Sequence, residues 1–157
     1  MAQLIKLSEH FTLHELTKSD CAMRFNIDNT PGEEEKSNLQ ILAKKLLEPI
    51  RALYSIPFTP NSTFRSEELN RKLGGAAKSQ HLQGQAADIE IIGIDNKQLF
   101  NDIRHKLDYD QVILEFYEEG NPSSGWVHVS YISPEDNRKE ALISFKNSER
   151  NIAYRLA

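Results

Sequence analysis

Three side chains in this sequence have the chemistry of metal ligands. His81 lies in a polar, glycine-containing stretch, Asp88 follows inside an apolar segment, and His128 stands between two valines in WVHVSYI. Each residue alone has an ordinary explanation, as a core or surface histidine or as an aspartate paired with a lysine. Together, two imidazoles and one carboxylate suit Zn²⁺ and leave a fourth position for water. Zinc lowers the pKa of such a water to about 7, which makes it a nucleophile at neutral pH.

A hydrolase with this site also needs a general base near the water. In QVILEF, Val112, Leu114 and Phe116 alternate on one face, so Glu115 points to the other. If this strand pairs antiparallel with WVHVSYI, Glu115 lies opposite or diagonal to His128, at a separation of about 5 Å. The alternative is a solvated glutamate on the face of a strand.

A second charged candidate is Arg65, which follows STF and precedes the start of a helix. Its guanidinium group can bind a substrate carboxylate with two parallel hydrogen bonds. An ordinary salt bridge explains the residue equally well. The remaining histidines, His10, His14 and His105, are predicted to be surface residues.

The elements that position these side chains follow from periodicity and caps. Thr12 and Glu15 form a capping box that begins a short helix. Apolar residues spaced by three and four predict further helices at residues 33–53, 66–73 and 96–107. Ser66 is the predicted cap of the second of these helices. Pro49 predicts a kink or break in the first. Alternating patterns predict strands at residues 86–92, 111–116, 126–132 and 140–146.

This order predicts one α+β domain over residues 1–157, with a mostly antiparallel sheet and helices packed on one face. The loop NPSSG joins two of the strands as a hairpin. The polar tail from about residue 147 is expected to be loosely held.

Composition excludes several classes of function. Among 157 residues, 19 are Lys or Arg and 23 are Asp or Glu, a net charge of −4 that argues against nucleic-acid binding. The single Cys21 excludes an internal disulfide and a cysteine-based zinc site. No continuous apolar stretch is long enough to span a membrane, and the N-terminus lacks the apolar core of a signal peptide. We therefore expect synthesis in the cytoplasm, so that action at the cell wall would require release by other means.

The stretch SQHLQGQAADIE resembles the signature Ser-x-His-x-x-Gly-x-Ala-x-Asp of the zinc D-alanyl-D-alanine peptidases. The fixed positions match at Ser79, His81, Gly84, Ala86 and Asp88. This resemblance implies the α+β fold shared by Hedgehog proteins and these peptidases.

Two further motifs extend the resemblance from about Phe11 to Ser130. STFRS resembles the family's Ser-x-x-Arg element, and WVHVS resembles the segment that carries the last zinc histidine. The opening FTLHELTKSDCAMRFNIDNTP is similar to the small phage and prophage branch.

By this resemblance, His81, Asp88 and His128 would bind zinc. Arg65 would hold the terminal carboxylate of the substrate or polarise its carbonyl group, and Ser79 would join it in substrate binding. The implied function is zinc-dependent hydrolysis of peptidoglycan stem peptides, as in a D-alanyl-D-alanine carboxypeptidase. The alternatives are an endopeptidase-type phage lysin and a non-catalytic binding or assembly module with a zinc fold.

The general base departs from the common family pattern. Many members place an acidic residue three positions before the last histidine, and here that residue is Gly125. This departure favours the binding module, whereas the presence of Glu115 and Arg65 favours an enzyme. Glu115 is the predicted base, with Glu118 or Glu119 as substitutes.

Overall fold

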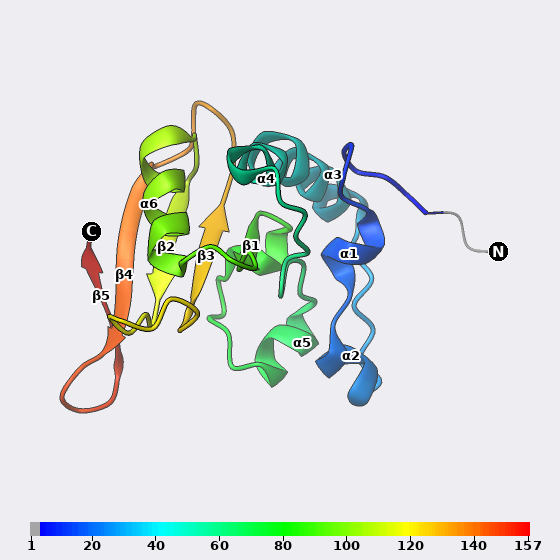
Figure 1. Ribbon diagram of the computed structural model, residues 1–157. Coiled ribbons are helices and arrows are strands. Elements are labelled where there is room, and N and C mark those ends of the chain that lie inside the picture. The colour runs from blue at the N-terminus through cyan, green and yellow to red at the C-terminus, as the bar shows by residue number, and fades with distance from the viewer. Residues whose placement is uncertain (1–3) are drawn as a thin grey trace.

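The computed structural model describes residues 4–157, in which most helices precede most strands (Figure 1). The helical elements are α1 (Leu13–Thr17), α2 (Asp20–Arg24), α3 (Glu33–Leu42), the π-helix η1 (Ala43–Leu47), α4 (Glu48–Tyr54), α5 (Glu67–Lys72), the 3₁₀-helix η2 (Gln80–Gln83) and α6 (Asn96–Lys106). The strands are β1 (Ala86–Ile89), β2 (Gln111–Glu115), β3 (Trp126–Ser130), β4 (Glu140–Lys146) and β5 (Ile152–Leu156). None of the helices described is long and apolar enough to cross a bilayer.

The strands form one sheet in the order β1-β3-β2-β4-β5. All neighbours pair antiparallel except β2 and β4, which run in the same direction. The connection through residues 131–139 returns the chain to the start of β4 beside β2. The predicted class, one α+β domain with a mostly antiparallel sheet and packed helices, is confirmed.

Local sequence signals explain where the helices begin and where one is interrupted. The capping box of Thr12 and Glu15 is present, and the Ser66 side chain accepts a hydrogen bond from the backbone of Leu69. The predicted disturbance near Pro49 appears as η1, a π-helical turn directly before Pro49 enters the first turn of α4. Since proline cannot donate the next helical hydrogen bond, the preceding turn widens instead of continuing regularly.

The two faces of the sheet have different surroundings. Helix α6 packs over β2 and β3, and it buries Leu99, Phe100 and Ile103 as predicted. The strand residues on this apolar face are also buried: Val112, Leu114, Val127 and Val129. Successive side chains on a strand point to opposite faces. The intervening residues, among them Glu115 and His128, therefore lie on the face away from α6.

The C-terminal segment differs from the expected loose tail. Residues 152–156 form β5, which pairs antiparallel with β4 along its length. Asn147 and Asn151 close the turn between the strands through a backbone hydrogen bond of 2.9 Å. Ile152, Tyr154 and Leu156 alternate as in a strand. The polar residues 147–151 that precede them led to the expectation of a loose tail.

Candidate metal centre

His81 is held by the short helix η2 and by a buried carbonyl group. The Ser79 side chain caps η2 and accepts a hydrogen bond from the His81 backbone N–H at 3.2 Å. The His81 residue is 3% exposed, and its Nδ1 lies 2.7 Å from the carbonyl oxygen of Thr63. A carbonyl group only accepts, so Nδ1 carries the proton and Nε2 presents a lone pair toward Asp88, whose Oδ2 lies 3.4 Å away. Metal-binding histidines are typically oriented in this way.

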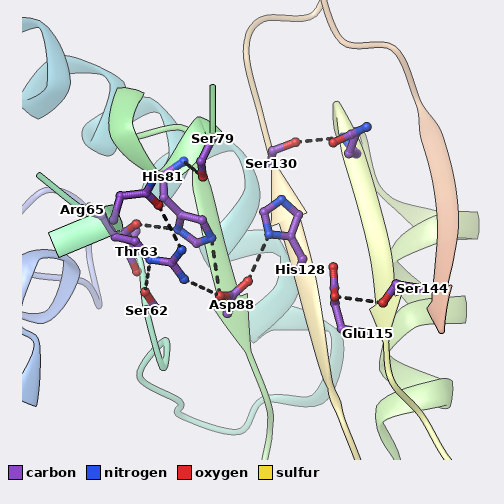
Figure 2. Close-up of polar contacts among 12 residues, drawn as sticks. Ser62, Thr63, Arg65, Ser79, His81, Asp88, Glu115, His128, Ser130 and Ser144 are labelled. Carbon is purple, nitrogen blue, oxygen red and sulfur yellow. Dashed lines mark hydrogen bonds and ion pairs between the residues drawn. The ribbon is translucent and has the colours of Figure 1, made fainter. Parts of the chain in front are cut away.

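The pairing of β1 with β3 brings the other two candidates together. Asp88 and His128 are directly opposed in the register, and His128 Nδ1 lies 3.0 Å from Asp88 Oδ1. One potential ligand atom from each of His81, Asp88 and His128 lies within 4.8 Å of the other two. Figure 2 shows both imidazoles directed at the Asp88 carboxylate. The three residues singled out by their chemistry thus form one cluster.

The protonation states of this cluster suit a cation. Burial disfavours the charged form of Asp88, but the two facing imidazoles, chiefly the hydrogen bond from His128 Nδ1, outweigh it and hold the pKa of Asp88 well below its usual range. Burial also lowers the pKa of His81. At neutral pH the cluster therefore offers a carboxylate and a neutral buried imidazole, the forms that bind metal ions.

Arg65 contacts Asp88 and other protein groups through all parts of its guanidinium group. Nη2 lies 3.1 Å from Asp88 Oδ2, Nε donates to Ser62 Oγ at 3.0 Å, and Nη1 donates to Asn70 Oδ1 at 3.4 Å. Its side chain is 13% exposed. The structure thus uses Arg65 to orient Asp88, and contact with a substrate carboxylate stays a prediction. The contact of Asn70 with Arg65 was not predicted from the sequence, because it depends on where α5 packs.

Glu115 lies beside the cluster on β2. It is opposite Trp126 in the register and therefore diagonal to His128, as predicted. Its carboxylate is largely buried, and its Oε2 accepts a hydrogen bond of 2.9 Å from Ser144 on β4. Burial raises the pKa of Glu115, although the Ser144 hydroxyl favours the ionised form. A largely desolvated carboxylate with a raised pKa is suited to accept a proton.

Gly125 explains why the acidic residue of the common family pattern is absent here. Its φ is +63°, and an added Cβ would lie 1.9 Å from the carbonyl oxygen of Glu115. An acidic side chain therefore does not fit at this position without a backbone shift. The substitutes Glu118 and Glu119 are exposed in the hairpin, and Glu119 forms an ion pair with Lys97 at 2.5 Å.

The cluster and Glu115 line a cavity of about 720 Å³ on the sheet face away from α6. The loop through residues 73–80 forms one side, and Ile152 and Tyr154 of β5 contribute to the lining. Ser79, the predicted substrate-binding residue, lines this cavity, and its contact with substrate stays a prediction. The histidines predicted to be surface residues, at positions 10, 14 and 105, are all exposed.

A buried ion pair that no local sequence pattern indicates lies next to the cavity. Asp110 is fully buried and accepts hydrogen bonds from Arg138 Nε at 2.9 Å, Arg138 Nη2 at 2.7 Å and Gln80 Nε2 at 2.9 Å. Burial opposes ionisation, but the Arg138 contacts outweigh it and hold the pKa of Asp110 at about 2. Because Gln80 belongs to η2, this ion pair fastens the helix that carries His81 to the sheet.

An α+β fold with a His-Asp-His cluster, a buried glutamate and an adjoining cavity defines the class of candidate metallohydrolases. The sequence profile of the family described as Peptidase M15 matches residues 9–130. The chain therefore belongs to the peptidase M15 family of metallopeptidases, which are zinc-dependent and act on peptidoglycan peptides. No curated protein matches the chain significantly. The donor set fits zinc, because two nitrogen ligands and one carboxylate oxygen leave one position open.

Proposed function

We propose that this protein is a zinc-dependent peptidase of peptidoglycan stem peptides, similar to D-alanyl-D-alanine carboxypeptidases, that acts at the cell wall. The observation that carries the proposal is the position of Glu115, buried and diagonal to His128 on the face that holds the cluster. When bound, zinc would polarise the scissile carbonyl group and lower the pKa of the attacking water.

The residues of this chain then have distinct roles. His81 Nε2, an Asp88 oxygen and His128 Nδ1 would hold the metal, and Arg65 would keep the Asp88 carboxylate oriented. Glu115 would accept the proton of the water and deliver it to the leaving amine. The Ser144 hydroxyl would fix one Glu115 oxygen, which leaves the other free for this transfer.

The contacts of Arg65 favour an endopeptidase as the second candidate. A carboxypeptidase needs a cation that is free to bind the terminal carboxylate, whereas the Arg65 donors already contact Ser62, Asn70 and Asp88. The non-catalytic module is disfavoured by Glu115. An unused carboxylate would be expected to face solvent, since burying a carboxylate is costly, but this one is only 9% exposed.

The test is to incubate the zinc-loaded protein with purified muropeptides and to measure product masses, with a chelated sample alongside. Loss of a single terminal D-alanine that the chelator abolishes identifies a carboxypeptidase. Cleavage within the stem or cross-bridge identifies an endopeptidase. If zinc-loaded protein yields no product with several wall types, hydrolysis is refuted and the binding module is supported.

Substitution of the base makes the test specific to the site. Glu115→Gln should retain zinc and lose about 10²–10⁴-fold in kcat, the usual contribution of a general base. Glu118→Gln is the matched control, because Glu118 is exposed in the adjoining hairpin, and it should keep full activity. Full activity of Glu115→Gln would remove Glu115 from the mechanism.

A further inference from the structure

The cavity lining holds more cationic than carboxylate side chains. Three cations line the cavity, Arg65, Lys78 and Arg138, against two carboxylates, Asp88 and Glu115. The chain as a whole carries a net charge of −4. A divalent metal would make the cavity more positive still. Arg65 pairs with Asp88, and Arg138 pairs with Asp110 behind the lining, so attraction for an anionic substrate depends on Lys78 and on the remaining donor of Arg138.

Arg138 has a fixed orientation and a free donor. Its Nε and Nη2 contact the fully buried Asp110, yet its side chain is 51% exposed, and Nη1 forms no hydrogen bond with any residue in 4–157. Glu140, which lies beside it at the start of β4, accepts a hydrogen bond from the Gln111 side chain at 2.5 Å. Arg138 therefore presents a preoriented nitrogen at the cavity, with little side-chain entropy left to lose on binding.

Lys78 also lines the cavity. It is exposed, and it forms no ion pair with the residues that the structure describes. Two residues further along, Gln80 donates to the same Asp110 oxygen that Arg138 Nη2 contacts. The backbone that carries Lys78 is thus fastened close to Arg138.

The distance of this pair from the metal cluster follows from the strand register. Asp110 directly precedes β2, and Ile113, near the middle of that strand, pairs with His128. Three residues of strand separate these positions, which corresponds to about 10 Å. An extended peptide covers this distance with two or three residues of its own.

We propose that Arg138 and Lys78 form an anion subsite, and that the substrate is a peptide with a free carboxylate about two residues from the bond that is cleaved. This inference rests on the proposed function. Family membership does not imply it, because Arg138 lies beyond residue 130, where the family match ends.

The test uses two synthetic pentapeptides, L-Ala-γ-D-Glu-L-Lys-D-Ala-D-Ala with a free α-carboxylate on the glutamate and the same peptide with a carboxamide there. For the zinc-loaded wild-type protein, we expect KM to be about tenfold lower for the carboxylate peptide. Calorimetric titration of zinc-loaded Glu115→Gln with both peptides measures the same preference as Kd, without hydrolysis.

Two variants assign the preference to the subsite. Lys78→Gln changes an exposed residue and should fold. Arg138→Lys removes the planar guanidinium group but keeps a positive charge beside buried Asp110, so it should also fold. Each should reduce the preference for the carboxylate peptide severalfold. Lys139→Gln is the matched control, because Lys139 is exposed, pairs with Asp108 and does not line the cavity. It should keep the full preference.

The outcomes separate the subsite from the reaction. Equal Kd values for the two peptides, or a preference that persists in both Lys78→Gln and Arg138→Lys, would overturn the subsite. If neither peptide is hydrolysed but calorimetry shows the carboxylate preference and its loss in the variants, the subsite stands and the proposed reaction fails on this substrate.

Discussion

Substitution of Gly125 by alanine should test how closely the hairpin turn packs against the strand that carries the base. The left-handed φ of +63° costs an alanine about 1–2 kcal/mol. The added Cβ would also lie 1.9 Å from the Glu115 carbonyl oxygen and 2.9 Å from backbone atoms of Phe116, which cannot rotate away. Overpacking of this kind costs about 1–3 kcal/mol more.

Gly120→Ala is the internal control for this experiment. Gly120 lies in the same hairpin with a φ of +83°, but an added Cβ would have no neighbour within 4 Å. Both variants therefore carry the backbone cost, and only Gly125→Ala carries the overlap. At about 3 °C per kcal/mol for a domain of this size, Gly125→Ala should melt about 3–9 °C below Gly120→Ala.

Scanning calorimetry of the wild type and both variants measures this difference, and kcat measured alongside reports on the base. Because the overlap pushes on the backbone of Glu115, Gly125→Ala should also lower kcat, whereas Gly120→Ala should leave it unchanged. Equal melting temperatures for the two variants would refute the close approach of Gly125 to β2.

Three further perturbations probe the site. Despite its burial, Asp110 has a pKa of about 2 through Arg138, so its charge stabilises the fold above about pH 4 and this stability is lost as the pH falls toward 2. Asp110→Asn should lower the unfolding free energy at pH 7 by on the order of 2 kcal/mol in urea titrations, and a gap that persists near pH 2 would contradict the assignment. Ser144→Ala removes a donor that favours ionised Glu115, so the acid limb of the kcat/KM profile should move to higher pH; an unmoved limb would exclude this role. His81→Ala should lose zinc in atomic absorption measurements, and unchanged zinc content would refute the ligand set.

The parts of the site that could be predicted from sequence depend on local spacing. His81 and Asp88 lie within one short motif, and the hairpin between β2 and β3 sets the diagonal relation of Glu115 to His128. Alternation alone placed Glu115 on the correct face, because a strand has a period of two.

The parts that could not be predicted depend on which strands become neighbours. Ser144 reaches Glu115 only because β4 runs parallel to β2, and alternation in a strand does not specify its partner. The ion pair of Asp110 with Arg138 also depends on the placement of β4 beside β2, because Asp110 directly precedes β2 and Arg138 closely precedes β4. Arg65 was recognised as important, but the partners of its guanidinium group come from segments whose packing no local pattern reveals.

The position of β5 determines where the sheet is exposed to pairing with other chains. β5 is an edge strand with unpaired backbone groups, and Ile152, Tyr154 and Leu156 are all more than half exposed. β4 and β5 together place this edge two strands away from β2, which carries Glu115 (Figure 1). We therefore expect fraying and intermolecular strand addition to begin at β5, and the backbone amides of β2 to exchange with solvent far more slowly. The strand that holds the candidate base is thus insulated from the part of the sheet that is most prone to aggregate.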